Sequence, residues 1–458
     1  MINRTDFLTS SLRQNAWGDC ICRILASAIH AVEPKQAIHR HLVRSGTQLS
    51  ISSRSYNLDD YERIIVIGAG KAGSPMAAAI EEILPDRQLD GLVITKEGYI
   101  SESSSTTLRR IQLVEAGHPI PDSRSIAATK RIINLLEQTN QETLVICLLS
   151  GGGSALMVSP VEGVSLFDLQ TLTTELLRCG ASINEINTLR KHLDQIKGGN
   201  LARLAAPAQV ISLVMSDVVA DPLDVIASGP TVPDTTTFDD AKQILEKYQI
   251  IEKIPRSIYE HISCGLDGFK PENPKPADRI FRNVNNVIIG SNQLAAQAAL
   301  ERAKVEGLNT IFLTSYLQGE ACQAGRFVAA LARQIAKDGN PIPRPACIIL
   351  GGETTVTLAG DGKGGRNQEL ALGSVGDLAG LLDIVLVSLA TDGGDGPTDA
   401  AGAVATGETL MRAQKAGLSA HASLAHNDAY HFFQSLDDLL LIGPTNTNVN
   451  DLVFLFAF

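Results

Sequence analysis

The sequence is poor in aromatic residues and has no excess of positive charge. Aromatic side chains make up 4% of its 458 residues, and the formal net charge is −11. Proteins that bind nucleic acid or anionic membranes non-specifically depend on basic surfaces, and many nucleic-acid platforms add aromatic rings. The composition argues against both classes. It leaves open a local basic pocket for a small anion.

Paired cysteines and long hydrophobic runs are also missing. The seven cysteines are scattered and include no Cys-x-x-Cys pair, so a reducing compartment is the simplest setting. The first 14 residues lack the apolar core of a signal peptide. The apolar stretch 21–32 contains Arg23 and His30 and is too short to cross a bilayer. We therefore expect a cytoplasmic protein.

Helical and strand patterns alternate from end to end, which is typical of an α/β protein. Hydrophobic residues make up 44% of the chain, and its length suggests two or three domains. The segment 249–285 carries four prolines among glycine, lysine and asparagine, which favours a connector between domains at 1–248 and 286–458. The polar segment 40–55 is expected to be irregular.

A glycine-rich stretch follows the first buried strand pattern, at 63–67. The pattern Gly-x-Gly-x-x-Gly is supplied by Gly68, Gly70 and Gly73, and a helical pattern follows. Such a turn lets the backbone approach an anion. Lys71 is unusual for a dinucleotide loop, whereas a phosphate or carboxylate site gains from a cation there. The alternative is a tight turn that packs a helix on a sheet, with Lys71 solvated.

A second glycine loop follows the strand pattern at 144–149. Three successive glycines cost chain entropy, which makes sense if backbone N–H groups converge on an anion. The flanking serines are expected to add hydroxyl donors. A flexible turn is the alternative. The loop consists of Ser150, Gly151, Gly152, Gly153 and Ser154.

Aspartates follow two other buried strand patterns. Asp217 comes after the strand at 209–215, where a carboxylate can hold a divalent cation or accept a proton. Asp392, Asp395 and Asp399 are spaced among glycines after the strand at 383–390, which suggests Mg²⁺ ligation. We take Asp217, Asp392 and Asp395 as candidate ligands. Turn capping is the alternative for each of them.

A third glycine loop, at 360–365, opens a helix with Arg366 at its start, and arginine offers a planar fork for carboxylate or phosphate. Before it, residues 346–356 read as strand, glycine turn, strand. Neither Lys71 nor Arg366 has an obvious charge partner in its own domain. Neither side chain is expected in a core, so alanine at either position is expected to change the thermal midpoint little. Further candidates for binding substrate or nucleotide are Glu353, Thr354, Asn367, Gly393 and Gly394.

Three other positions carry charge or a ring nitrogen with less specific signals. His118, in a turn after a strand pattern, is either a ligand or a hydrogen-bonded loop residue. Arg190 and Lys191 could reach an anion, but their helical pattern favours a solvated face.

Taken together, six stretches resemble the class II glycerate kinases, whose C-terminal part carries the MOFRL domain, here about 346–456. The matching stretches are IGAGKAG (67–73), LLSGGGSALM (148–157), MSDVVADPLDVIASGPTVPD (215–234), GGETTVTLAGDGKGGRNQELAL (351–372), ATDGGDGPTDAAGA (390–403) and GPTNTNVNDL (443–452). The segment VADPLD departs from the GDDPS-like sequence that is more usual in the family, so no role is assigned to Asp221 or Asp224.

The resemblance implies a kinase that uses ATP and Mg²⁺ to phosphorylate D-glycerate, at O2. It implies two α/β/α domains, the first Rossmann-like with a mainly parallel sheet and the second with a mixed sheet. The active site is expected in the cleft between them, with Lys71 and Arg366 as its basic pair. Apart from the resemblance, Asp217 and Asp392 are candidates for the catalytic base or a Mg²⁺ ligand. A homodimer is compatible with this picture. No nucleic acid or membrane partner is expected.

Two other functions remain open at this point. The first is an NAD(P)H-dependent hydroxypyruvate reductase, supported by Gly-x-Gly-x-x-Gly and by Glu97 as a possible ribose ligand. The second is a non-catalytic protein that binds a nucleotide or carboxylate. A P-loop kinase is excluded, because Gly-x-x-x-x-Gly-Lys-Ser/Thr does not occur.

Overall fold

The chain divides into two compact units. The computed structural model describes residues 2–100, 108 and 110–458. The first unit comprises Pro34–Ser216 and Asp221–Ile289; the second comprises Met1–Glu33, Asp217–Ala220 and Gly290–Phe458. Each unit has its own sheet and its own core.

The first unit is built on a six-stranded sheet with the order β6-β5-β4-β7-β8-β9. This is the strand order of a doubly wound fold, in which the chain reverses direction across the sheet between β4 and β7. The pairs from β6 through β8 are parallel. The strands are β4 (Arg63–Ala69), β5 (Leu89–Lys96), β6 (Ile111–Ala116), β7 (Thr143–Leu149), β8 (Gln209–Met215) and β9 (Val284–Gly290).

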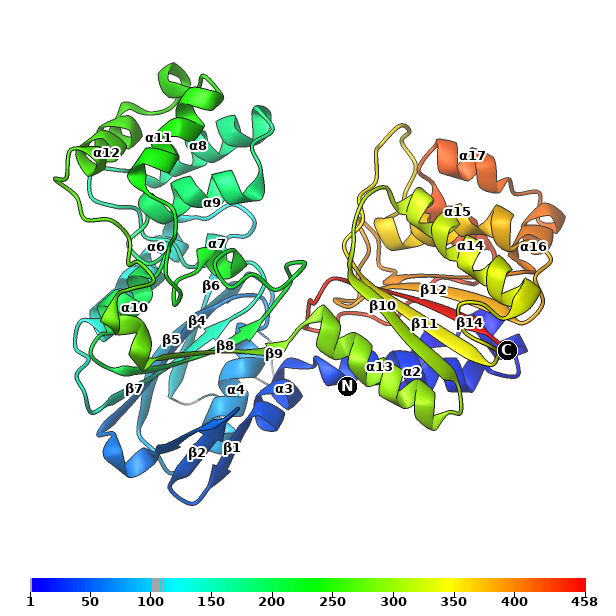
Figure 1. Ribbon diagram of the computed structural model, residues 1–458, viewed down its shortest axis with the longest axis horizontal. Helices are drawn as coiled ribbons and strands as arrows, with labels where there is room; N and C mark the ends of the chain where they lie inside the picture. Colours follow the sequence, from blue (N-terminus) through cyan, green and yellow to red (C-terminus); the bar gives the residue numbers. More distant parts are fainter. Residues whose placement is uncertain (1, 101–107, 109) are drawn as a thin grey trace. The chain divides into compact units, whose positions relative to one another are not determined.

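Some helices of this unit pack on the sheet, and four others form a separate group at one side of it. α3 (Pro34–His41) and α4 (Gly73–Ile83) share a core with β4 and with a small antiparallel sheet of β1 (Leu42–Ser45), β2 (Gln48–Ile51) and β3 (Arg54–Asn57). α6 (Ser123–Leu136) packs on β5 and β6. The separate group has its own apolar core and is visible in Figure 1; it consists of α8 (Leu166–Arg178), α9 (Ile183–His192), α11 (Phe238–Lys247) and α12 (Arg256–Leu266). Two short helices, α7 (Gly153–Leu156) and α10 (Asn200–Ala205), complete the unit.

The second unit has a five-stranded mixed sheet with the order β10-β11-β14-β12-β13. β10 and β11 are parallel, and the other pairs are antiparallel. β14 therefore lies in the middle of the sheet although it comes last in the sequence. The strands are β10 (Asn309–Leu317), β11 (Ala346–Gly352), β12 (Ile384–Ala390), β13 (Gly402–Thr406) and β14 (Asp451–Ala457).

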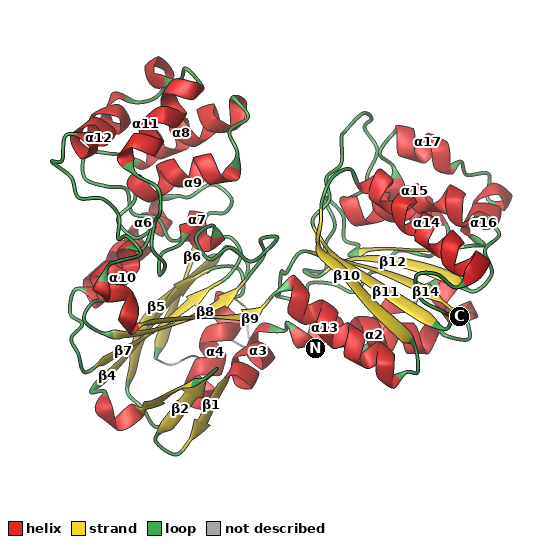
Figure 2. Ribbon diagram, in the orientation of Figure 1, coloured by secondary structure: helices red, strands yellow, loops and turns green. Residues whose placement is uncertain are grey.

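Side chains of β14 alternate between two cores, as expected for a strand covered on both faces. Phe454 and Phe456 pack with α2 (Gly18–Ala31) and α13 (Asn292–Val305), whereas Val453 and Leu455 pack with α14 (Ala321–Asp338) and α15 (Arg366–Leu378). Figure 2 shows these helices on opposite sides of the sheet. The shorter helices are α1 (Ser10–Gln14), α16 (Thr409–Lys415), α17 (Ala420–Ala425) and α18 (Ala429–Ser435).

These observations confirm the predicted α/β class, with one mainly parallel sheet and one mixed sheet. The division differs from the predicted boundaries in three places. The segment up to Glu33 belongs to the second unit, because the apolar face of α2 packs against α13. β9 completes the first sheet, and the expected connector 249–285 contains α12, which packs on α11.

Two local predictions were wrong. The segment 40–55 is regular, because Leu42, Leu49 and Ile51 supply buried anchors for α3 and the small antiparallel sheet. No second strand follows the turn after β11; Thr355 makes only an isolated bridge to Glu320.

All seven cysteines are free thiols. Among the described residues, every helix is too short or too polar to span a bilayer.

Candidate functional site

Two glycine loops meet where the first sheet reverses its strand order. Lys71 donates its backbone N–H to the carbonyl of Gly151 at 2.9 Å, and Ala72 donates to the Ser150 hydroxyl at 3.0 Å. Gly70 has φ of +144°, and a Cβ there would come 2.0 Å from Ser150 Oγ. The first loop therefore binds the second loop directly. Its N–H groups, which a dinucleotide-binding loop would offer to a pyrophosphate, are satisfied inside the protein.

The second loop leaves donors available. Among the described residues, the N–H groups of Gly151 and Gly152 have no hydrogen-bond acceptor. Gly152 has φ of +86°, and a Cβ there would lie 2.9 Å from Nε2 of His118. A side chain at this position would therefore be strained and would collide with the imidazole. The backbone is arranged as a small nest for an anion beside His118.

Two lysines and a histidine lie at the carboxyl ends of neighbouring strands. Lys71 follows β4, Lys96 ends β5 and His118 follows β6. Burial, together with the positive charges of Lys71 and Lys96, lowers the pKa of His118 to about 4. The imidazole is thus neutral at physiological pH. Parallel strands present their carboxyl ends at one edge, which is where ligands bind in open α/β sheets.

The pKa of His118 makes a prediction about stability. A histidine in the unfolded chain has a pKa near 6.5, whereas His118 in the folded chain has a pKa of about 4. Between these two pH values the unfolded chain binds a proton at this ring that the folded chain does not. Acidification through this window should therefore lower the free energy of unfolding. The decrease should be smaller in His118→Gln, measured by denaturant titration at each pH. Exposed His421→Gln is the control, and an equal decrease in both variants would contradict the prediction.

A hydrogen-bonded chain runs from the second loop to α9. Oγ of Ser154 lies 3.0 Å from Oγ of Ser228, which donates to Oδ1 of Asn187 at 3.1 Å. Because the Ser228 proton is used there, Ser154 donates to Ser228, and Ser154 Oγ is left as an acceptor. This corrects the expectation that Ser154 supplies a hydroxyl donor. Ala227 and Ser228 hold φ of +50° and +59°, strained values that cluster at functional sites.

The basic residues of α9 do not form a solvated face. Lys191 is buried, with its ammonium 3.5 Å from Asp234 and 3.7 Å from Asp224. Arg190 is half-buried, and burial lowers its pKa. Among the described residues it makes no ion pair. The sequence prediction failed because the helix group of α8, α11 and α12 covers the other sides of α9.

In the second unit, Arg366 has charge partners that the sequence did not reveal. Nε and Nη2 contact the carboxylate of Asp451, and Nη1 lies 2.9 Å from Oε1 of Glu353. Asp451 is 5% exposed; burial raises its pKa, and the Arg366 guanidinium opposes that shift. The interpretation that Arg366 has no structural partner in its own domain was therefore wrong, and alanine there is now expected to lower the free energy of unfolding.

Asp395 and Asn367 have structural roles in this unit. The Asp395 carboxylate accepts the N–H groups of Asn367 at 3.1 Å and Gln368 at 2.9 Å, which caps the start of α15. Burial raises the pKa of Asp395 to about 6. The Asn367 amide joins Asp395 to Ser388 on β12. With both oxygens engaged and a buried carboxyl, Asp395 is a poor metal ligand.

Asp392 and Asp217 are less buried than Asp395. Asp392 is half-buried, and one of its oxygens accepts the N–H of Gly394 at 3.1 Å. Gly393 has φ of +89°, which permits this turn, and Thr354 is buried. Asp217 follows β8 and is half-buried. Asp217 and Asp392 therefore stay candidate metal ligands or bases, and the prediction of one cleft between the domains stays a prediction.

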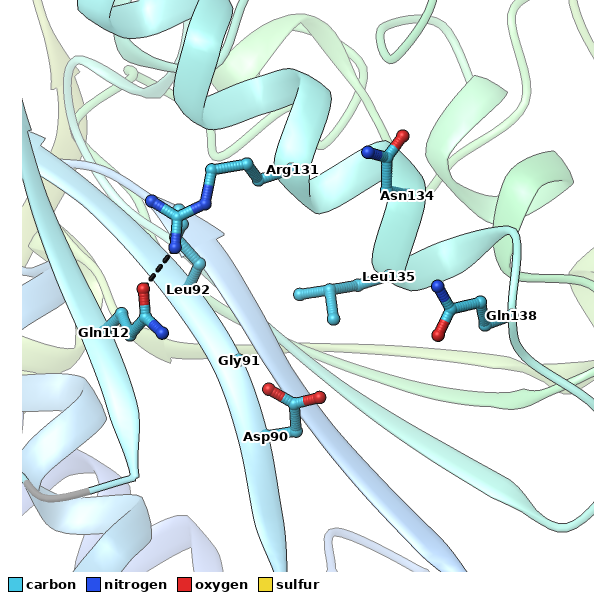
Figure 3. Close-up of a pocket in the computed structure, with 8 residues that line it drawn as sticks. All are labelled: Asp90, Gly91, Leu92, Gln112, Arg131, Asn134, Leu135 and Gln138. Carbon is cyan, nitrogen blue, oxygen red and sulfur yellow. Dashed lines mark hydrogen bonds between the residues drawn. The ribbon is translucent and has the colours of Figure 1, made fainter.

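One acidic cluster and one cavity lie away from the glycine loops and the candidate aspartates. Glu320, Cys322 and Glu369 lie close enough to hold a cation, but Thr357 and Asn427 already donate to the two carboxylates. A cavity of about 220 Å³ lies at the amino ends of β5 and β6, on the edge opposite to the glycine loops (Figure 3). It is lined by Asp90, Gly91, Leu92, Gln112, Arg131, Asn134, Leu135 and Gln138.

Sequence reasoning missed Lys96, Asn187 and Ser228, and it set Arg190 aside. The spacing of Asn187 and Arg190, three residues apart on a helix, was the available signal, since it puts both on one face. Nothing in the sequence linked that face to Ser228.

Comparisons with known proteins cover almost the whole chain. Residues 20–263 match a family described as a domain of unknown function (DUF4147), and residues 346–451 match the MOFRL family. A glycerate 2-kinase of Pyrococcus horikoshii is 41% identical over 94% of this chain and 95% of its own length. A D-glycerate 2-kinase of Thermotoga maritima is 42% identical over 94% of this chain and 96% of its own.

A protein of Agrobacterium vitis named putative hydroxypyruvate reductase is 41% identical over 85% of this chain and 98% of its own length. The crystal structure of a glycerate kinase from Thermotoga maritima superposes with a TM-score of 0.85 at 40% identity, covering 96% of this chain and 99% of that one. The resemblance noted in the sequence is thereby confirmed, and the chain belongs to the glycerate 2-kinase family.

Proposed function

We propose that this protein phosphorylates D-glycerate at O2, with ATP as donor and Mg²⁺ as the required cation. The observation that carries the proposal is the pair of glycine loops at the strand-order reversal. Among the described residues the N–H groups of Gly151 and Gly152 have no acceptor there, and Lys71 follows the neighbouring strand. Phosphoryl transfer needs alignment and positive charge around the moving group, which such loops supply.

The reductase alternative fits the loops less well. The N–H groups of Lys71 and Ala72 are used by the second loop and cannot cradle a pyrophosphate. Glu97, the possible ribose ligand, instead pairs with Arg124 at 2.8 Å. A non-catalytic binding protein would explain the basic loops but not Asp217 and Asp392. The kinase accounts for all of these residues.

Within this proposal each group has a role. Lys71 and the Gly151 and Gly152 N–H groups hold phosphoryl oxygens, and Arg366 supplies a second cation. Asp217 and Asp392 are the residues that would hold Mg²⁺ or accept the hydroxyl proton, and their half-buried carboxylates at strand ends suit both tasks. Bound Mg²⁺ supplies charge neutralisation on the phosphates.

Purified protein should release ADP only when both D-glycerate and Mg²⁺ are present, and EDTA should abolish the reaction. Phosphorus NMR of the product should show 2-phosphoglycerate. A 3-phosphate would reject the O2 assignment. Consumption of NADH with hydroxypyruvate, without ADP release from glycerate, would reject the kinase.

Asp217→Asn and Asp392→Asn should each lose most of the activity while the fold survives, because each removes a negative charge needed for the metal or the proton. Rates are measured at saturating Mg²⁺, and folding is checked by circular dichroism. Asp399→Asn is a matched control from the same turn as Asp392, since Asp399 is exposed and bonded to Tyr430. Near-normal rates in either test variant would show that this aspartate only caps a turn.

We also propose a cytoplasmic location, which the free thiols favour. The homodimer stays a prediction.

A further inference from the structure

One face of α9 carries both Asn187 and Arg190. Asn187, one turn earlier, accepts a hydrogen bond from Ser228, and Ser228 is bonded to Ser154 of the second glycine loop. Residues three apart on a helix lie on the same face. Arg190 therefore belongs to the face of α9 that is turned toward the glycine loop.

The charges around Arg190 are unbalanced. Lys197, a buried lysine, is close enough that the positive charge of Arg190 adds to burial in lowering its pKa. Lys197 is itself neutralised by Asp194 at 2.6 Å, and Lys191 has Asp234. In the described part of the chain no carboxylate pairs with Arg190. A half-buried cation beside another cation is unfavourable until an anion binds it.

We propose that Arg190 binds the carboxylate of D-glycerate. This inference rests on the proposed function and names the residue that selects an acidic substrate. The planar guanidinium fork matches a carboxylate through two parallel hydrogen bonds, which the ammonium of Lys71 cannot provide. Ser154 Oγ, an acceptor, receives a hydrogen bond from a hydroxyl of the same substrate. Lys71 and the free N–H groups are left for the phosphoryl group.

The test compares glycerate with glyceramide, its uncharged amide. Arg190→Ala should raise the KM for D-glycerate by roughly 10²-fold, lower kcat much less and leave the KM for ATP unchanged, because only carboxylate binding is lost. The preference for glycerate over glyceramide should fall by a similar factor. Arg190→Lys keeps the charge without the fork and should raise the KM by about 10-fold.

Two other basic residues of the same helix group serve as controls. Lys191→Ala leaves the buried Asp234 without its cation, so it should lower the thermal midpoint while the glycerate preference of the folded protein stays. Arg178→Ala removes an exposed arginine of α8 that pairs with Glu175 and should change neither. A merely structural role for Arg190 would make its variants behave like Lys191→Ala.

The outcomes separate this inference from the proposed function. Failure of the wild-type protein to phosphorylate glycerate would reject the function. If the wild type is active but Arg190→Ala keeps its KM and its preference for the charged substrate, the inference is wrong. A loss confined to kcat would assign Arg190 to the phosphoryl group and overturn it as well. Should the alanine variant not fold, Arg190→Lys decides by the same readout.

Discussion

Replacing Arg366 by alanine should lower kcat/KM for glycerate by at least about 10²-fold, and replacement by lysine should fall far short of restoring it. Arginines that stabilise charge in phosphoryl transfer contribute roughly 10³ to 10⁵ in rate. Asp451 holds Nε and Nη2, so the guanidinium is fixed with Nη1 toward the half-exposed Glu353. An ammonium can replace the charge but not this fixed planar geometry.

Stability must be measured alongside the kinetics of Arg366→Ala. Removing the guanidinium leaves the buried Asp451 without its cation, at a cost of about 3–5 kcal/mol in the free energy of unfolding. Arg412→Ala is a matched control, because Arg412 pairs with the fully buried Asp438 in the same unit, at 2.6 Å. It should lose similar stability yet keep kcat/KM when rates are expressed per folded protein. Wild-type kcat/KM in Arg366→Ala would show that Arg366 is only a structural pair.

Lys71→Ala should also lower kcat/KM by about 10²-fold or more, but with little change in the thermal midpoint. Among the described residues the Lys71 ammonium makes no ion pair, so the folded state loses no partner when it is removed. Its backbone N–H, which holds the second loop, is retained by alanine. The cation is therefore expected to serve the ligand alone.

The Lys71 prediction is checked by steady-state kinetics with thermal unfolding. Lys71→Met, which keeps the apolar stem, is the matched variant and should lose as much activity as alanine. The double variant Lys71→Ala/Arg366→Ala should lose less than the product of the two single losses, because both cations act in one step. Unchanged kcat/KM in Lys71→Ala and Lys71→Met would place the phosphoryl group elsewhere.

The two sheets were largely predictable because their strands are buried on both faces and read as continuous apolar runs, such as 63–67 and 144–149. The boundaries between the two units were not predictable. The apolar face of α2 shows that this helix packs on something, but the sequence does not say that its partner is α13, more than 250 residues later. Long-range partners of this kind are set by the whole fold.

The turns at 68–73 and 150–154 were predictable, because their glycines meet backbone needs within a short stretch of sequence. The site was not predictable where a side chain depends on a distant partner. Arg366 looked unpaired because Asp451 lies 85 residues away, and Asp395 looked like a metal ligand because its place beneath α15 is a tertiary feature. Arg190 was predicted to be solvated because the sequence does not show that α8, α11 and α12 pack on α9.

The central position of β14 has a consequence for the order in which the protein is made. The strands that flank it, β11 and β12, are synthesised earlier but have no direct pairing with each other. Until β14 leaves the ribosome, β11 and β12 each have an unpaired edge. Over the same period α2 lacks the side chains of β14 that complete its core. The first unit, whose sheet closes with β9, can mature while the second is still a nascent chain. Chaperone demand during translation therefore concentrates on the segments flanking a unit that is already folded.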